Sequence, residues 1–192
     1  KTTNGYAKVP QLFAQITQPD DVDFLIIPSV SSERRRYVPI GFATQDIISS
    51  NAVQIVPNAT LYHFGVLTSN VHMAWMRAVC GRLKSDYRYS KEIVYNTFPW
   101  PKPTEEQKIK IEQTAQMILN AREQYSDCSL ADMYGEKMYL FPELVKAHQD
   151  NDRAVMQAYG FTKGSEAYKS EAACVAELMK LYQKKVEELE KR

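Results

Sequence analysis

Glycine-rich loops, long apolar runs and paired cysteines are all missing from this sequence. Its 7 glycines show neither the spacing of a dinucleotide-binding loop nor that of a phosphate-binding loop. We therefore expect no cofactor in this chain. No run of about 18 apolar residues is present to span a bilayer. The opening residues, "KTTNGYAKVPQLF", also lack the apolar core of a signal peptide, so we expect a soluble, cytoplasmic protein without membrane contact.

The three cysteines, Cys80, Cys128 and Cys174, exclude two further classes of protein. Their odd number and wide spacing suit neither a disulfide framework nor a zinc site. We expect them to be reduced and to behave as small hydrophobic residues.

Motifs for catalysis are also scarce. The histidines, His63, His72 and His148, lack metal-ligand spacing, and no G-x-S-x-G motif is present to place a serine nucleophile. We expect each histidine to be a hydrogen-bonded structural residue, and we assign no catalytic or metal-binding residue. The segment from Asn96 to Trp100 is similar to the Asn-Pro-Pro-aromatic loop of amino-methyltransferases, but its prolines are not adjacent. A structural role is the preferred interpretation.

The first half of the chain has a net positive charge and most of the aromatic residues. Residues 1–100 hold 10 Lys and Arg against 7 Asp and Glu, whereas residues 101–192 hold 14 against 16. Of the 21 aromatic residues, 13 lie in the first hundred, including both tryptophans. The two parts of the chain are therefore expected to have different roles.

The pattern of hydrophobic residues changes near Pro101. Before it, short runs rich in Val, Ile, Phe and Tyr alternate with Pro, Gly or Asn, which predicts a mixed sheet with prolines at strand ends or edges. These runs are "DFLIIPSV", "RYVPIGF", "AVQIVPN" and "LYHFGVLTS". One helix is predicted from about residue 70 to 83, followed by extended chain through "KSDYRYS" and "EIVYNTF".

After Pro103 the period is helical. Thr104 and Gln107 form a capping-box pattern, Ser129 begins a second helix, and Pro142 begins a third that ends at Gly160. A last helix is predicted over residues 165–190. The fold class is therefore α+β, with a strand-rich mixed α/β domain at residues 1–101 and a helical bundle at residues 102–192.

Two basic stretches, "SSERRRYVPIGF" and "WMRAVCGRLKSDYRYS", contain arginines interleaved with serine and tyrosine. Such side chains offer DNA phosphates both positive charge and neutral hydrogen-bond donors. On composition alone, phosphate contact and simple solvation explain these stretches equally well.

Four strings then carry a resemblance that covers nearly the whole chain. They are "SSERRRYVPIGF", "NATLYHFGVLTSNVHMAWMRAVCGRLKSDYRYSKEIVYNTFPWP", "AREQYSDCSLADMYGEKM" and "LVKAHQDNDRAVMQAYG". The chain resembles the C-terminal region of MmeI-like (Type IIL) restriction-modification enzymes, which are adenine-N6 DNA methyltransferases fused to a nuclease. The resemblance implies a DNA target-recognition domain followed by a helical domain. It also implies that S-adenosylmethionine, and Mg for cleavage, are bound upstream in a longer chain, and the first residue, Lys1, agrees with a fragment of such a chain.

The resemblance also implies a role for the string "GRLKSDYRYS". In this family two residues spaced i, i+2 after "GRL" read one base pair, and here they are Lys84 and Asp86. Lysine can donate to O6 and N7 of guanine, and aspartate can accept from N4 of the paired cytosine, both in the major groove. On one strand, residues i and i+2 would face the same way. The alternative is a surface ion pair of little energetic value.

Further contacts with double-stranded DNA are expected from neighbouring residues. Asn51 is a weaker candidate for base reading, because asparagine can pair with adenine through two hydrogen bonds. Six cationic residues are expected to contact phosphates. They are Arg34, Arg35, Arg36, Arg82, Arg88 and Lys91.

Two other functions remain open from the sequence. The chain could complete the pocket of the methyltransferase domain upstream, or its helical half could be a protein-interaction module. Trp75, Phe98 and Trp100 are expected to form core that supports the recognition segment.

Overall fold

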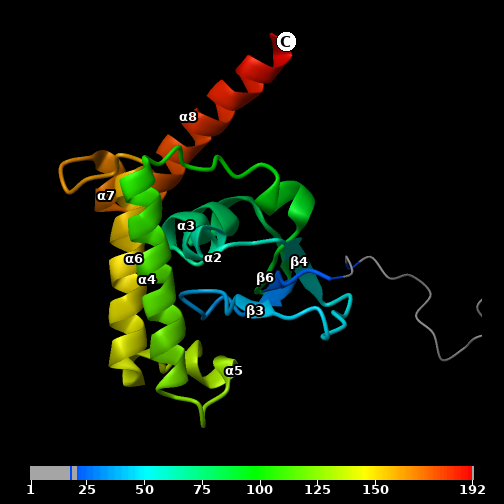
Figure 1. Ribbon diagram of the computed structural model, residues 1–192. Coiled ribbons are helices and arrows are strands. Elements are labelled where there is room, and N and C mark those ends of the chain that lie inside the picture. Colours follow the sequence, from blue (N-terminus) through cyan, green and yellow to red (C-terminus); the bar gives the residue numbers. More distant parts are fainter. Residues whose placement is uncertain (1–17, 19–20, 192) are drawn as a thin grey trace, which may run out of the picture.

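The computed structural model describes residue 18 and residues 21–191 (Figure 1). The strands are β1 (Phe24–Pro28), β2 (Val30–Ser31), β3 (Gly41–Ala43), β4 (Val53–Pro57), β5 (Gly81–Leu83) and β6 (Asp86–Arg88). The helices are α2 (Leu61–Leu67), α3 (Asn70–Val79), the π-helical turn η1 (Lys91–Tyr95), α4 (Glu105–Glu123), α5 (Leu130–Met133), the 3-10 turn η2 (Met138–Leu140), α6 (Pro142–Ala158), α7 (Glu166–Lys169) and α8 (Glu171–Glu190). The predicted α+β class is confirmed.

The strands form two small antiparallel sheets, and the prediction of one mixed sheet was wrong. One sheet has the order β3-β1-β4 and the other the order β2-β6-β5. Ser29 joins them, because its N–H donates to the Ala52 carbonyl (2.9 Å) and its carbonyl accepts from the Tyr89 N–H (2.9 Å). Pro28 and Pro57 lie at strand ends, as predicted.

The segment "LYHFGVLTS" is helical, so the prediction of a strand there was also wrong. Thr60 caps α2 in a capping box with His63. Four consecutive residues, 64–67, are buried, so no amphipathic period shows in the sequence. Gly65 allows this helix to approach α4, because a Cβ at that position would lie 2.7 Å from Cγ2 of Ile111.

Three other predicted elements differ in their bounds or type. The helix predicted to reach residue 83 ends at Val79, since Cys80 is extended and Gly81 begins β5. The segment "EIVYNTF" begins as the π-helical turn η1, not as a strand, with the Asn96 N–H donating to the Lys91 carbonyl (2.8 Å). The last predicted helix is divided at Ser170, whose extended backbone and side chain cap α8.

The other helix boundaries of the second half follow the sequence. The capping box of Thr104 and Gln107 is formed, Ser129 caps α5, and Pro142 occupies the first turn of α6. Gly160 follows α6 with a φ of +75°, the left-handed conformation expected of a glycine after a helix end. In Figure 1, α4 and α6 lie side by side and the end of α8 extends away from the other helices.

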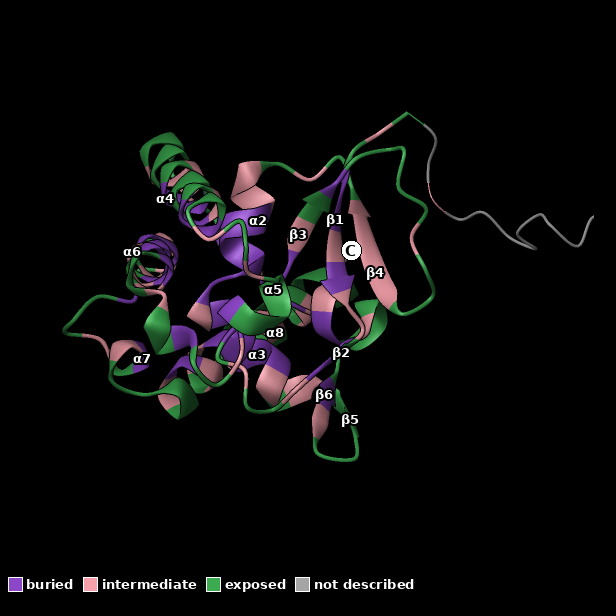
Figure 2. Cartoon of the chain, turned by 90° about the horizontal axis from the view of Figure 1, so that it is seen from below, coloured by how far each residue is buried: buried purple, intermediate pink, exposed green. Residues whose placement is uncertain are grey.

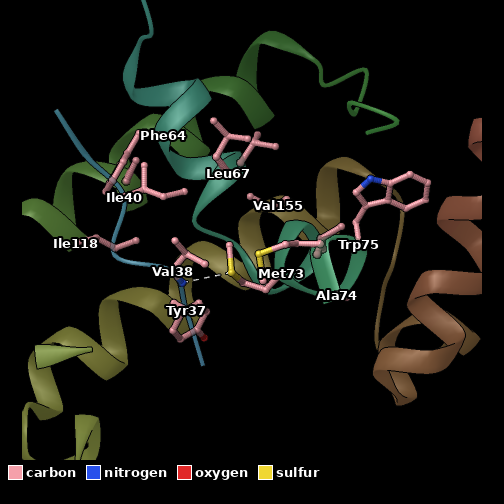
Figure 3. Close-up of a cluster of buried hydrophobic side chains, with 14 of the residues drawn as sticks. Tyr37, Val38, Ile40, Phe64, Leu67, Met73, Ala74, Trp75, Ile118 and Val155 are labelled. Atoms are coloured by element: carbon pink, nitrogen blue, oxygen red, sulfur yellow. Dashed lines mark hydrogen bonds between the residues drawn. The ribbon is translucent and has the colours of Figure 1, made fainter. Parts of the chain in front are cut away.

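One hydrophobic core connects both halves of the chain. It runs from Leu25 in β1 to Leu178 in α8. Figure 3 shows its centre, where the chain between β2 and β3 passes between the helices and the Val38 N–H donates to the Met73 sulfur (3.4 Å). Trp75 and Phe98 are buried in this core and the partly buried Trp100 packs against it, as predicted. None of the described helices has the length and apolar character needed to cross a membrane.

Candidate nucleic-acid interface

The string "GRLKSDYR" forms a β-hairpin with an exposed tip. Leu83 of β5 pairs with Asp86 of β6, so that Lys84 and Ser85 form a two-residue turn. Figure 2 shows β5 and the turn as exposed. In β6 only the central residue, Tyr87, is buried. A hairpin of this kind is narrow enough to enter the major groove of DNA.

Lys84 does not lie on a strand, so the premise that it shares a strand face with Asp86 was wrong. Its φ is +57°, in the left-handed region that non-glycine residues rarely adopt. Asp86 is the first residue of β6 and is half-buried. The two side chains therefore flank Ser85 at the tip. Whether they contact one base pair remains a prediction.

Arg82 supports this turn. Its guanidinium lies over the Tyr87 ring, 4.0 Å from the centroid, and donates to the Ser85 carbonyl (2.8 Å). Glu33 is 3.8 Å away. Since several of its interactions are made within the protein, Arg82 acts here to hold the hairpin, and its predicted contact with phosphate is untested.

An open cleft of about 400 Å³ lies beside the hairpin tip. Three segments that are distant in sequence line it: residues 32–35, residues 85–86 and residues 135–136. The structure thus brings Asp86 together with Arg34 and Arg35. We call this the recognition cleft.

Arg34 already has a partner in the recognition cleft. Its Nη1 is 2.6 Å from Oε1 of Glu136, in the loop between α5 and η2. The hydrogen bond and the charge of Glu136 raise the pKa of Arg34, and Glu33 and Asp86 add smaller contributions of the same sign. Sequence reasoning missed Glu136, because a single glutamate 102 positions away has no local pattern to mark it.

The remaining predicted contact residues lie outside the recognition cleft. Arg36 is exposed, near the Tyr37 ring, and its carbonyl accepts from Arg77 (2.5 Å). Arg88 is exposed on β6, at the end away from the tip. Lys91 instead lines a separate groove of about 300 Å³ between β4 and η1.

Asn51 is exposed in the turn before β4. The neighbouring Ala52 is joined through Ser29 to Tyr89, so Asn51 lies near the end of β6 opposite the tip. The structure therefore does not bring Asn51 together with Lys84 and Asp86.

Buried polar residues hold the segment of residues 32–40 onto the helices. Arg122 of α4 donates to the Ile40 carbonyl (2.8 Å) and, through Nε, to the Tyr134 hydroxyl (2.8 Å). That hydroxyl is 2.7 Å from Nε2 of His148. Burial lowers the pKa of His148 well below its ordinary value, with Arg122 and Arg36 adding to the effect, so its ring is neutral at pH 7.

Tyr37 extends this buried polar network to α6. Its ring stacks on His148 with 4.2 Å between centroids, and its hydroxyl donates to Oδ2 of Asp152 (2.7 Å). The other carboxylate oxygen accepts from the Asn70 N–H (2.7 Å) at the start of α3. Burial raises the pKa of Asp152 to about 6, although both hydrogen bonds oppose the shift. The network positions the arginines of the recognition cleft against the helical half.

Each of the three histidines has a hydrogen-bond partner, as predicted. His63 accepts from the Thr60 N–H (3.1 Å), and His72 is buried with Nε2 3.0 Å from the Tyr89 hydroxyl. Burial lowers the pKa of His72 to about 3. Among the described residues, no group of three or more His, Cys, Asp and Glu is arranged to hold a metal ion.

The segment from Asn96 to Trp100 also has the features of a structural element. Phe98 is fully buried, and its ring packs edge-on against His72 with 4.5 Å between centroids. Trp100 lies among the rings of Tyr62, His63 and Tyr95. These rings are engaged within the protein, which agrees with the structural interpretation of the segment.

The matching family models give the class of protein: a target recognition domain followed by a C-terminal domain. The family model of the MmeI target recognition domain matches residues 1–102, and that of the MmeI C-terminal domain matches residues 103–190. The chain belongs to the MmeI family.

Two relatives agree with this assignment. DNA methyltransferase A of Bacillus subtilis (strain 168) is 38% identical over 187 residues, which are 97% of this chain and 20% of that protein. The Type IIL restriction-modification enzyme MmeI, solved in complex with DNA, is 46% identical with a TM-score of 0.86, over 95% of this chain and 24% of that chain. The chain thus spans about a fifth to a quarter of the length of these relatives.

Proposed function

We propose that this chain is the sequence-specific DNA recognition part of a Type II restriction-modification enzyme that methylates adenine at N6. The observation that carries the proposal is the exposed β5–β6 hairpin, whose tip places Lys84 and Asp86 on either side of Ser85 beside the recognition cleft. The similarity to MmeI, whose structure was solved with DNA, supports it.

Base reading is assigned to the hairpin tip. Lys84 donates to O6 and N7 of a guanine, and Asp86 accepts from N4 of the paired cytosine, with the hairpin in the major groove. The exposed turn gives the Lys84 ammonium free access to a base, and the half-buried Asp86 is fixed by the β6 ladder. Asn51 is assigned a second, separate base contact.

Phosphate contacts surround the tip in this proposal. Arg34 and Arg35 lie in the recognition cleft, and Arg88 is exposed on the same hairpin. Arg36 and Lys91 lie further away and are assigned contacts with more distant phosphates, and Arg82 contributes charge while it holds the turn. Such contacts carry little sequence information, but they fix the register of the protein on the duplex.

The remaining functions are assigned to the longer enzyme. The division into a recognition domain at residues 1–101 and a helical domain at residues 102–192 is part of the proposal. S-adenosylmethionine, and Mg for cleavage, act in the methyltransferase and nuclease parts upstream, which this chain orients on the DNA. We place the enzyme in the cytoplasm, where its DNA substrate is found.

Selection of binding sites tests the proposal. The 192-residue chain is incubated with a library of duplexes that contain a randomised segment, and the bound DNA is sequenced over several rounds. Enrichment of one motif is expected. Binding without any enriched base would contradict sequence-specific recognition by this chain.

A further inference from the structure

Glu136 is a negative charge inside a cleft that we assign to DNA. It comes from the helical half of the chain, and its carboxylate is 2.6 Å from the guanidinium of Arg34. Both side chains are well exposed, Arg34 at 72% and Glu136 at 62%. Each can therefore exchange its partner without any change in the core.

The other acids of the recognition cleft have separate explanations. Asp86 accepts a hydrogen bond from a base in the proposed function, and Glu33 lies 3.8 Å from Arg82, which holds the hairpin turn. Within the described residues, Arg34 is the one ion-pair partner of Glu136. A carboxylate in this position repels a DNA phosphate, so it does not favour the DNA complex. Its favourable interaction is the ion pair with Arg34 in the free protein.

The loop that carries Glu136 is held in place. The preceding Tyr134 is fully buried and its hydroxyl is bound by Arg122. The Gly135 N–H donates to the Asp132 carbonyl (3.2 Å), and a Cβ at position 135 would lie 3.2 Å from the Ala131 carbonyl oxygen. The carboxylate is therefore presented to Arg34 by a fixed part of the fold.

We propose that Glu136 is an intramolecular competitor of DNA phosphate, which occupies Arg34 in the free protein and is displaced when DNA binds. This inference rests on the proposed function. Because phosphates are the same at every sequence, the competition lowers affinity for all DNA by one common factor. The ratio between target and other DNA is unchanged, while occupancy of non-target DNA is reduced.

The test compares Glu136→Gln with the parent chain. Binding to a fluorescent 20-base-pair duplex of arbitrary sequence is measured by anisotropy at several salt concentrations. We expect Glu136→Gln to bind about two- to fivefold more tightly, the range of a surface ion pair. For this variant the slope of log K against log salt should be steeper than that of the parent by up to about 0.9. In the parent, the contact of Arg34 with phosphate is made at the expense of its ion pair with Glu136, and in the variant there is no such ion pair to break.

The matched control is Glu187→Gln. It makes the same change in net charge near the exposed end of α8, and no ion pair of Glu187 is present in the described structure. This variant should bind as the parent does. An equal gain in both variants would overturn the proposal, since net charge alone would then explain the effect.

A second background separates local competition from a general repulsion. In Arg34→Gln, the further change Glu136→Gln should give no gain, because the residue that is competed for is absent. A gain in affinity of the same size with and without Arg34, or no gain in either background, would overturn the proposal.

The two proposals can fail separately. If neither the parent nor Glu136→Gln bound duplex DNA, the proposed function would fail as well. If both bound DNA with the same affinity, only the competition by Glu136 would be refuted.

Discussion

The Tyr37 hydroxyl donates a hydrogen bond of 2.7 Å to Oδ2 of Asp152, which lies 115 positions further along the chain. This buried contact joins the segment that carries Arg34 and Arg35 to helix α6. The position of the recognition cleft therefore depends on the helical half, and the two halves are expected to unfold together because they share one core.

Asp152 should make stability depend on pH. Burial raises its pKa to about 6 from an ordinary value of 3.8, so the folded protein favours the protonated carboxyl. Its contribution to stability is fully present below pH 3.8 and is lost as the pH rises to about 6, a total of about 3 kcal/mol. In urea unfolding, the free energy of the parent relative to Asp152→Asn should therefore fall between pH 4 and 6. The exposed Asp127 provides the control variant, Asp127→Asn. If the stability difference between parent and Asp152→Asn changed with pH no more than the difference between parent and this control, the pH dependence would not arise from Asp152.

Lys84→Gly should separate stability from recognition. The φ of +57° is unfavourable for lysine by roughly 1 kcal/mol and is free of strain for glycine. We expect the variant to be as stable as the parent or up to about 1 kcal/mol more stable, while it loses its preference for one base pair. Ser85→Gly is the control, because Ser85 does not have a left-handed backbone conformation. A glycine there relieves no strain, so this variant should be slightly less stable than the parent. A loss of stability in Lys84→Gly larger than that in Ser85→Gly would argue against strain at this turn.

Gly65→Ala should weaken the contact between the two halves. The added Cβ would lie 2.7 Å from Cγ2 of Ile111, and overpacking of this kind costs about 1–3 kcal/mol. Thermal unfolding should therefore show a lower midpoint for this variant. Gly164→Ala provides the comparison, since a Cβ there meets no atom within 4 Å. Equal midpoints for the two variants would refute the close approach of α2 to α4.

Arg35→Gln should weaken binding to all DNA sequences alike. Loss of one charge-assisted hydrogen bond of ~1.5 kcal/mol corresponds to roughly tenfold in affinity, and the salt slope should decrease by about 0.9. Arg153→Gln removes the same charge from α6, where Arg153 pairs with Asp150 outside the recognition cleft, and should have little effect. Anisotropy titrations that gave the same affinities for both variants would remove Arg35 from the interface.

Local patterns were sufficient to predict some parts of this molecule. Thr104, Pro142 and Gly160 mark helix ends through interactions with their immediate neighbours, and these boundaries were predicted correctly. The helix α2 was missed because burial on several faces removed its amphipathic period. The turn at Lys84 was missed because a lysine gives no indication of a left-handed backbone.

The recognition cleft also could not be predicted from local sequence patterns. Its lining comes from three segments separated by about fifty residues each, so it exists only through the packing of one half on the other. The sequence indicated that Arg34, Arg35 and Asp86 are candidates for DNA contact, but it did not indicate that they share a cleft. The role of Glu136 follows only from its distance to Arg34.

The proposed function requires Lys84 and Asp86 to specify one base pair, and a charge exchange at the hairpin tip tests this requirement most directly. The double variant Lys84→Glu with Asp86→Arg reverses donor and acceptor, so it should favour the opposite orientation of that pair. A good contact of this kind discriminates by about 1–3 kcal/mol, roughly ten- to a hundredfold. Either single change places two like charges around Ser85 and should impair recognition more than the double change does.

The measurement is made in the full-length enzyme that contains this chain. A DNA library is methylated by the parent and by the double variant, and the modified sites are sequenced. Reversal of one G·C pair in the recognised sequence, with all other positions unchanged, is the predicted result. An active double variant that still methylates the parent's sequence would contradict the assignment of Lys84 and Asp86 as the base-reading residues.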